Sequence, residues 1–170
     1  MEIRDPIAND ANAAPELVLR PLTSADAGAA AELIRKAFAA QNRRTTPPSS
    51  ALVETGSSIA AKIAAGGGFG VFEGGALIAA VLWSLNHDAL HVARVSVAPG
   101  ARGRGIVRLL IAACETEARR RGVRGMTLKT RLELPENERL FRRCGFARRE
   151  VEAYPGFETP RIAVMEKVLS

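Results

Sequence analysis

The sequence predicts an α/β fold in which a mixed central sheet of about seven strands is flanked by about four helices. Apolar residues fall into short β-rich runs and into longer runs with helical spacing. These runs follow one another in the order strand, helix, helix, three strands, helix, strand, helix and two strands. The strand–helix–strand unit at 90–131 should form a right-handed parallel crossover, which makes the sheet mixed.

The N-terminal third is expected to contain one strand and two helices. Residues 17–20 form a short apolar strand that ends at a proline. Thr23 provides a hydroxyl cap and Asp26 an acid three residues later, a pattern typical of a helix start. The segment 41–50 contains consecutive prolines and is expected to be a loop. A second helix is expected over 49–65, where a run of glycines ends it.

The rest of the chain alternates between strands and helices. The Gly74-Gly75 dipeptide separates two β-rich runs and predicts a tight hairpin. The run 77–83 is apolar throughout, which indicates a strand covered on both faces. The strands expected in this part are 69–73, 76–85, 90–97, 125–131, 146–153 and 161–169. The helices expected in this part run from the turn at 103–105 to the basic segment 119–122, and over 135–144.

Length and composition fit one globular domain, because the chain has 170 residues of which 47% are hydrophobic and 25% charged. We expect residues 1–16 to be a flexible extension and residues 17–170 to be the folded domain. The extension lacks the basic and apolar regions of a signal peptide, and no apolar run approaches the roughly 20 residues of a membrane helix. Cys114 and Cys144 are too few for a disulfide framework, so a cytoplasmic location away from membranes is expected.

The positive charge of the chain is concentrated in one part. Residues 94–149 contain fourteen arginines and one lysine against five acidic residues, whereas the remainder is acidic on balance. Such an excess fits an anionic partner, either a nucleic acid or a small ligand with several phosphates; a solvated arginine-rich surface is the alternative. Aromatic residues make up only 5% of the chain, which argues against stacking on bases. We therefore expect no nucleic-acid partner.

A turn rich in glycine and arginine follows the strand at 90–97 and opens the next helix. The first backbone N–H groups of a helix have no internal partners, and together with the helix dipole they attract anions. Gly103 and Gly105 remove Cβ atoms, so the backbone can approach a phosphate. Arg102, Arg104 and Arg108 add positive charge beside it. The turn therefore predicts a cradle for a phosphate or pyrophosphate.

Two better-known phosphate motifs fit this turn less well. The P-loop needs a Gly-Lys-Ser/Thr triplet, which does not occur in the chain. The dinucleotide fingerprint needs Gly or Ala where Arg108 stands, and an acid about 20 residues further on, where the chain is basic.

Residues 94–146 resemble the GNAT family of N-acetyltransferases. Arg102-Gly103-Arg104-Gly105-Ile106-Val107 matches the family's Arg/Gln-x-x-Gly-x-Gly/Ala loop at the first and fourth positions and departs from it at Val107. The segment 132–146 resembles the family's helix and turn with the pattern LPEN…LY…GF. The resemblance implies the GNAT fold and an acyltransferase that uses acetyl-CoA, without a metal, to acetylate an amine.

The resemblance also implies which residues hold the co-substrate. The strand 95–97 would diverge from the next strand and bind the pantetheine arm through its free backbone groups. A backbone N–H near Val95 or Ser96 would polarise the thioester oxygen. The residues expected to contact acetyl-CoA are Val95, Ser96, Val97, Arg102, Gly103, Arg104, Gly105, Ile106, Val107, Arg108, Asn137 and Phe141.

Phe141 departs from the family pattern. Family members often have a tyrosine at this position as general acid for the leaving thiolate, and the only tyrosine here, Tyr154, lies outside the motif. Either another group protonates the thiolate, or none is needed because thiol pKa values lie near 8.5. The alternative function is a non-catalytic module that binds or senses acyl-CoA.

Two residues are candidates for the general base. His91 lies on the strand 90–97, near the place where some family members carry a catalytic glutamate; a hydrogen-bonded strand histidine is the alternative. Glu73 is the rival base. Neither cysteine has a histidine beside it, which favours core packing over a covalent acetyl-enzyme. We therefore expect direct attack of the amine in a ternary complex.

The acceptor is expected to be a small-molecule or peptide amine. Its site should be built from the two N-terminal helices, the loop at 41–50 and the loop at 153–160. The acidic balance outside 94–149 favours a cationic acceptor. A homodimer is compatible with the sequence.

Overall fold

The structure, a computed structural model, describes residues 15–41 and 43–170. The extension expected over 1–16 lies outside the described residues except for its last two positions. The strands are β1 (Leu17–Pro21), β2 (Gly67–Glu73), β3 (Ala76–Asn86), β4 (Ala89–Val97), β5 (Gly125–Arg131), β6 (Ala147–Glu152) and β7 (Ile162–Val168). The helices are α1 (Ala27–Ala39), α2 (Gly56–Ala65), α3 (Ile106–Arg120) and α4 (Pro135–Arg143), with short 3-10 turns at Ser24–Asp26, Ser50–Val53 and Pro99–Ala101.

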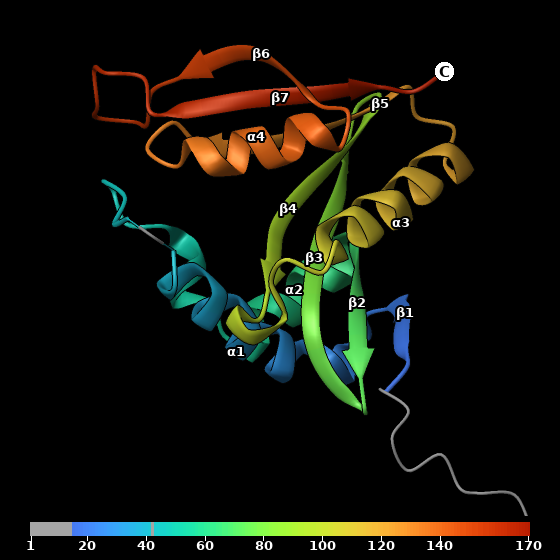
Figure 1. Ribbon diagram of the computed structural model, residues 1–170. Coiled ribbons are helices and arrows are strands. Elements are labelled where there is room, and N and C mark those ends of the chain that lie inside the picture. Colours follow the sequence, from blue (N-terminus) through green and yellow to red (C-terminus); the bar gives the residue numbers. More distant parts are fainter. Residues whose placement is uncertain (1–14, 42) are drawn as a thin grey trace, which may run out of the picture.

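The seven strands form one mixed sheet in the order β1-β2-β3-β4-β5-β7-β6, which confirms the predicted fold class (Figure 1). β4 and β5 are parallel neighbours joined through α3, as the crossover at 90–131 predicted. The other neighbouring pairs are antiparallel. Gly74 and Gly75 adopt φ angles of 56° and 80° between β2 and β3, so the predicted hairpin is confirmed together with its need for glycine.

Each face of the sheet is covered by a pair of helices. On one face, Leu110 of α3 and Phe141 of α4 share a core with buried residues of β4 and β5. On the other face, Ile34 of α1 and Ile59 of α2 pack against buried residues of β3. No helix in the part of the chain that the structure describes is both long and apolar enough to cross a bilayer.

The single helix expected over 49–65 is wrong, because the segment forms a 3-10 turn at Ser50–Val53 and only then α2. Thr55 and Ser58 form a capping box: the Thr55 hydroxyl accepts from the Ser58 N–H at 3.1 Å, and the Ser58 hydroxyl accepts from the Thr55 N–H at 2.8 Å. This cap needs extended backbone before the helix, and Glu54 and Thr55 have ψ angles of 140° and 166°. The Glu54 carboxylate becomes buried beside the sheet as a result.

Candidate active site

β4 and β5 pair at one end and separate at the other. Their parallel ladder runs from Ala89 opposite Gly125 to Val92 opposite Leu128 and ends there. The strands then diverge, as predicted (Figure 1). Residues of both strands line a cavity of about 620 Å³. Over residues 93–97, the edge of β4 that faces β5 therefore has no ladder partners from β5.

β4 contains a bulge at the mouth of this cavity. Arg94 has a φ of 55°, and the register between β3 and β4 shifts between Ala80 and Leu82 on the opposite strand. The buried Ser96 hydroxyl donates to the Arg94 carbonyl at 2.9 Å and so supports the bulge. A non-glycine residue at positive φ costs roughly 1–3 kcal/mol, and such residues are typical of functional sites. Residues 94–96, which form the bulge, line the cavity.

The turn between β4 and α3 has the geometry predicted for an anion cradle. Gly103 and Gly105 have φ angles of 76° and 74°, and no heavy atom lies within 4 Å of the place where either would carry a Cβ. Gly105 is the N-cap of α3, so the free N–H groups of the first helical turn begin directly after it. Both glycines line the cavity together with Arg102 and Arg108. The arrangement can bind a pyrophosphate through backbone N–H groups and two guanidinium groups.

Arg104 and Glu73 lie apart from the cavity and are not among the described residues that line it. The Arg104 guanidinium reaches β2 instead, where its Nη2 lies 2.5 Å from Glu73 Oε2. The hydrogen bonds from Arg104 hold the pKa of Glu73 below its usual value. A carboxylate with a lowered pKa, outside the cavity, is poorly suited to accept a proton from the acceptor.

The structure brings the other predicted site residues together around one cavity. The residues that line it are His91, Val95, Ser96, Val97, Arg102, Gly103, Gly105, Ile106, Val107, Arg108, Asn137 and Phe141.

His91 projects from β4 into the cavity. Its neighbours Leu90 and Val92 are buried in the core beneath α3, so the alternation of the strand directs His91 to the opposite face. Its Nδ1 lies 3.1 Å from the Thr127 hydroxyl of β5, which leaves Nε2 for a ligand. Burial, and secondly the positive charge of Lys129, lower the pKa of His91. The imidazole is therefore neutral at neutral pH and can accept a proton.

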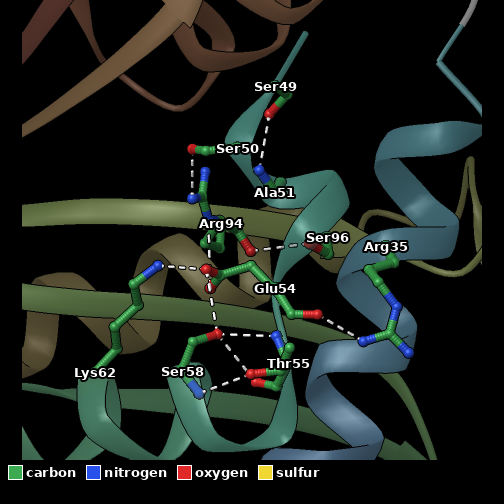
Figure 2. A network of polar contacts seen from close by, with 10 residues as sticks. All are labelled: Arg35, Ser49, Ser50, Ala51, Glu54, Thr55, Ser58, Lys62, Arg94 and Ser96. Carbon is green, nitrogen blue, oxygen red and sulfur yellow. Dashed lines mark hydrogen bonds and ion pairs between the residues drawn. The ribbon is translucent and has the colours of Figure 1, made fainter.

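A polar network around the buried Glu54 holds the side chain of Arg94 at the bulge. Figure 2 shows Glu54 at the centre of this network. Glu54 is 5% exposed, and its Oε1 accepts from Lys62 at 2.6 Å. Its Oε2 lies 3.7 Å from Nε of Arg94, whose Nη2 donates to the Ser50 hydroxyl at 2.8 Å. Arg35 of α1 donates to the Glu54 carbonyl oxygen at 2.6 Å. The network joins the α1–α2 segment to β4 at the cavity.

Glu54→Gln is expected to lower the free energy of unfolding by about 2–3 kcal/mol, because Arg94 would lose its only buried countercharge in the described residues. The midpoint of urea unfolding measures the change. Glu32→Gln is the matched control: it removes the same charge from an exposed pair with Lys36 and should cost less than about 1 kcal/mol. Equal losses in the two variants would contradict a structural role for Glu54.

The far end of the cavity is lined by residues that the motifs did not identify. Lys129 and Arg131 reach it from β5, and Tyr154 reaches it from the segment between β6 and β7. The Arg131 guanidinium lies 4.4 Å from the centre of the Tyr154 ring. The alternation of side chains along β5 could have identified them. Its even-numbered residues 126, 128 and 130 are buried, which leaves Lys129 and Arg131 on the same face of the sheet as His91.

Only part of the region expected to bind the acceptor lines the cavity. The end of α1 and the adjoining loop contribute Phe38, Gln41, Pro48, Ser49 and Ser50 to the lining, while residue 42 of that loop lies outside the described residues. The segment 153–160 contributes Tyr154. α2 contributes none of the described lining residues, because it faces β2 and β3 instead.

Neither cysteine belongs to the candidate site in the part of the chain that the structure describes. Cys114 is fully buried on α3, where burial raises the pKa of its thiol to about 12. Burial also raises the pKa of Cys144. Neither residue is among the described residues that line the cavity. A thiolate nucleophile is therefore not offered by either side chain.

A model of the acetyltransferase (GNAT) family matches residues 29–146, which is more than half of the chain. Among solved structures, the ribosomal-protein-S18-alanine N-acetyltransferase from Escherichia coli has a TM-score of 0.73 at 19% identity, covering 91% of this chain and 95% of that one. The PaiA N-acetyltransferase from Thermoplasma acidophilum, solved with coenzyme A, has a TM-score of 0.72 at 16% identity, covering 91% and 99%. Ard1 from Thermoplasma volcanium has a TM-score of 0.71 at 14% identity, covering 91% and 98%. The comparison with curated protein sequences finds no match.

Proposed function

Because the chain belongs to the acetyltransferase (GNAT) family and is an N-acetyltransferase that uses acetyl-CoA, we propose that it transfers the acetyl group directly to a neutral amine of the acceptor in a ternary complex. The observation that carries the direct route is the composition of the cavity wall. None of its described residues is a cysteine, and the one buried serine, Ser96, donates its proton to the Arg94 carbonyl. The wall thus offers a base, His91, without an activated nucleophile beside it.

The cradle suits the pyrophosphate of coenzyme A. Gly103 and Gly105 leave the approach to the first turn of α3 open, and Arg102 and Arg108 supply positive charge. Val107, where the family prefers a smaller residue, still has its backbone N–H, so this departure leaves the donor in place. Asn137 and Phe141 line the cavity from α4.

The cleft between β4 and β5 suits the pantetheine arm and the reacting group. Acetyl-CoA supplies the thioester whose acetyl group is transferred. Residues 93–97 of β4 present backbone groups that β5 does not pair, and these can bind an extended arm as a further strand would. The backbone N–H of Val95 or Ser96 lies at the bulge and polarises the thioester oxygen. His91 takes the proton of the attacking amine, directly or through a water molecule.

Initial velocities of CoA release, measured while acetyl-CoA and amine are varied together, test the ternary complex. Intersecting double-reciprocal lines are expected, and parallel lines would overturn it. Thermal shifts with acetyl-CoA and CoA check the cradle independently, because a ligand that binds only the folded state raises Tm. Binding of acetyl-CoA without CoA release from any amine would instead favour the acyl-CoA-binding module.

Phe141→Tyr is expected to leave kcat unchanged or to raise it, because the new hydroxyl could protonate the leaving thiolate. Phe141 lines the cavity and is 8% exposed, with its ring at 6.2 Å from that of Phe146 in an edge-to-face contact. Phe146→Tyr is the matched control, because Phe146 is 3% exposed and is not a described lining residue. That variant should lose stability without gaining activity. A large fall in kcat for a well-folded Phe141→Tyr would count against this position for the general acid.

A further inference from the structure

We infer that the acceptor is a small amine that carries a carboxylate, and that Arg131 of β5 binds this carboxylate at the far end of the cavity, while Arg94 of β4 adds positive charge to the same wall. The inference rests on the proposed transfer to an amine and adds the class of acceptor. It reverses the expectation of a cationic acceptor, which came from the charge balance of the chain outside 94–149. The described charges on the cavity wall itself are mainly positive, whereas the chain outside 94–149 is acidic on balance.

The wall of the cavity is basic at both ends. Its described charged residues are Arg94, Arg102, Arg108, Lys129, Arg131 and Glu136. Arg102 and Arg108 belong to the cradle, and the remaining three bases lie on the two diverging strands. The cradle is proposed to bind the phosphates of coenzyme A, which leaves these three bases available to attract a second anionic group.

The acids that accompany these bases hold them from outside the cavity. Glu152 accepts from Lys129 at 2.9 Å, and Glu133 lies 3.7 Å from Nη1 of Arg131. Neither of these acids, nor Glu54 behind Arg94, is a described lining residue. The pairs therefore orient the basic groups without covering the side that faces the cavity, which is the arrangement of a preorganised anion site.

The side chain of Arg131 is held in a fixed position by its neighbours. Its side chain is 12% exposed, its guanidinium stacks on Tyr154, and its buried Nη1 has no hydrogen-bond partner in the described residues. Glu133 cannot serve it fully, because the same carboxylate lies 3.7 Å from Arg161 and accepts from the Thr46 N–H at 3.1 Å. The buried Nη1 lies on the side of Glu133, so a ligand carboxylate in the cavity would be bound by Nε or Nη2, neither of which is a buried atom without a partner among the described residues.

Arg94 provides a fixed guanidinium on the other arm of the cleft. The positive φ of its backbone, its bond to Ser50 and its pair with Glu54 hold the side chain in place (Figure 2). The basic wall also lowers the pKa of an ammonium group held near His91, which favours the neutral amine that attacks. A carboxylate on the acceptor compensates for this repulsion and keeps the acceptor bound. One wall thus explains both affinity and reactivity.

CoA release with matched pairs of amino acids and amino acid amides tests the inference, because the two members of a pair share the side chain and only one carries the carboxylate. Rates are compared per neutral amine, because the carboxylate also raises the pKa of the neighbouring ammonium group. For the parent protein, kcat/KM is expected to be at least about tenfold higher for the acids, the value of one lost charge-assisted hydrogen bond. Arg131→Gln should abolish this preference while leaving the affinity for acetyl-CoA unchanged, and Arg131→Lys should retain part of it. Arg149→Gln, on the exposed side of β6, is the matched control and should keep the preference.

The outcomes separate this inference from the proposed function. If the parent protein acetylates amides or uncharged amines as well as it acetylates amino acids, transfer stands and the carboxylate site is overturned. If no member of the panel releases CoA, calorimetric titration of the CoA-bound protein with the same pairs decides. Binding of the acids that Arg131→Gln removes would support the site although the transfer proposal fails. Equal binding of acids and amides, or binding of neither, would overturn the site.

Discussion

Gly105→Glu is expected to weaken the binding of coenzyme A by about a hundredfold or more while the chain still folds. Gly105 caps α3 at a φ of 74°, with no heavy atom within 4 Å of its absent Cβ, so a longer side chain has room. The new carboxylate would lie in front of the free N–H groups where the phosphates should bind. Loss of a single charge-assisted hydrogen bond costs about 1.5–3 kcal/mol, and charge repulsion adds to it. We therefore expect affinity to fall by about a hundredfold or more.

Gly105→Ala is the control for backbone strain. Both variants force a side chain onto a left-handed residue, at a cost of about 1–2 kcal/mol. Only the glutamate brings a negative charge, and an acid at a helix N-terminus stabilises the helix, so Gly105→Glu should unfold at a temperature no lower than that of Gly105→Ala. Calorimetric titration with CoA measures the affinity. Equal affinities for the glutamate and alanine variants would show that no phosphate lies at this turn.

The cradle could be predicted because its geometry depends on neighbouring residues. Gly103 and Gly105 adopt positive φ, and the helix that follows begins one residue later, so the sequence contains the whole cradle. The Gly74-Gly75 hairpin was predictable for the same reason. Arg104 was placed in the cradle by its position in the motif, but the preference of its guanidinium for Glu73, on another strand, takes it elsewhere.

The acceptor end depends on contacts between segments that are far apart in the chain. Arg131 contacts Tyr154, and Arg94 pairs with Glu54, across elements that are distant in the sequence. No local pattern marks such pairs. A two-residue break before α2 also decides where Glu54 lies, and a helical run of small apolar residues concealed that break. The sequence pattern therefore predicted the glycine-rich turn for which co-substrate binding is proposed, and it did not identify the side chains at the other end of the cavity.

His91→Ala is expected to lower kcat at least about tenfold with little change in the affinity for acetyl-CoA, because a general base typically contributes 10²- to 10⁴-fold. An alkyl ammonium with a pKa near 10.4 is neutral in only about one molecule in 2,500 at pH 7, so a proton must be removed before or during attack. His91 lines the cavity, and the Thr127 hydroxyl at 3.1 Å orients its ring. His87→Ala is the control, because His87 is exposed in the turn between β3 and β4.

The pH dependence of kcat distinguishes a base from a structural histidine. Burial and Lys129 lower the pKa of His91, so the parent protein should lose activity only below the ordinary histidine range near 6.5, as protonation removes the base. This fall of kcat at low pH, the acidic limb of the pH profile, should disappear in His91→Ala. Lys129→Gln removes one of the two causes that lower the pKa, so its limb should move to higher pH. If kcat of His91→Ala stays within about a factor of two of the parent value, with the same acidic limb, His91 is not the base. The proton would then pass to water, because Glu73 lies outside the described lining of the cavity and is paired with Arg104.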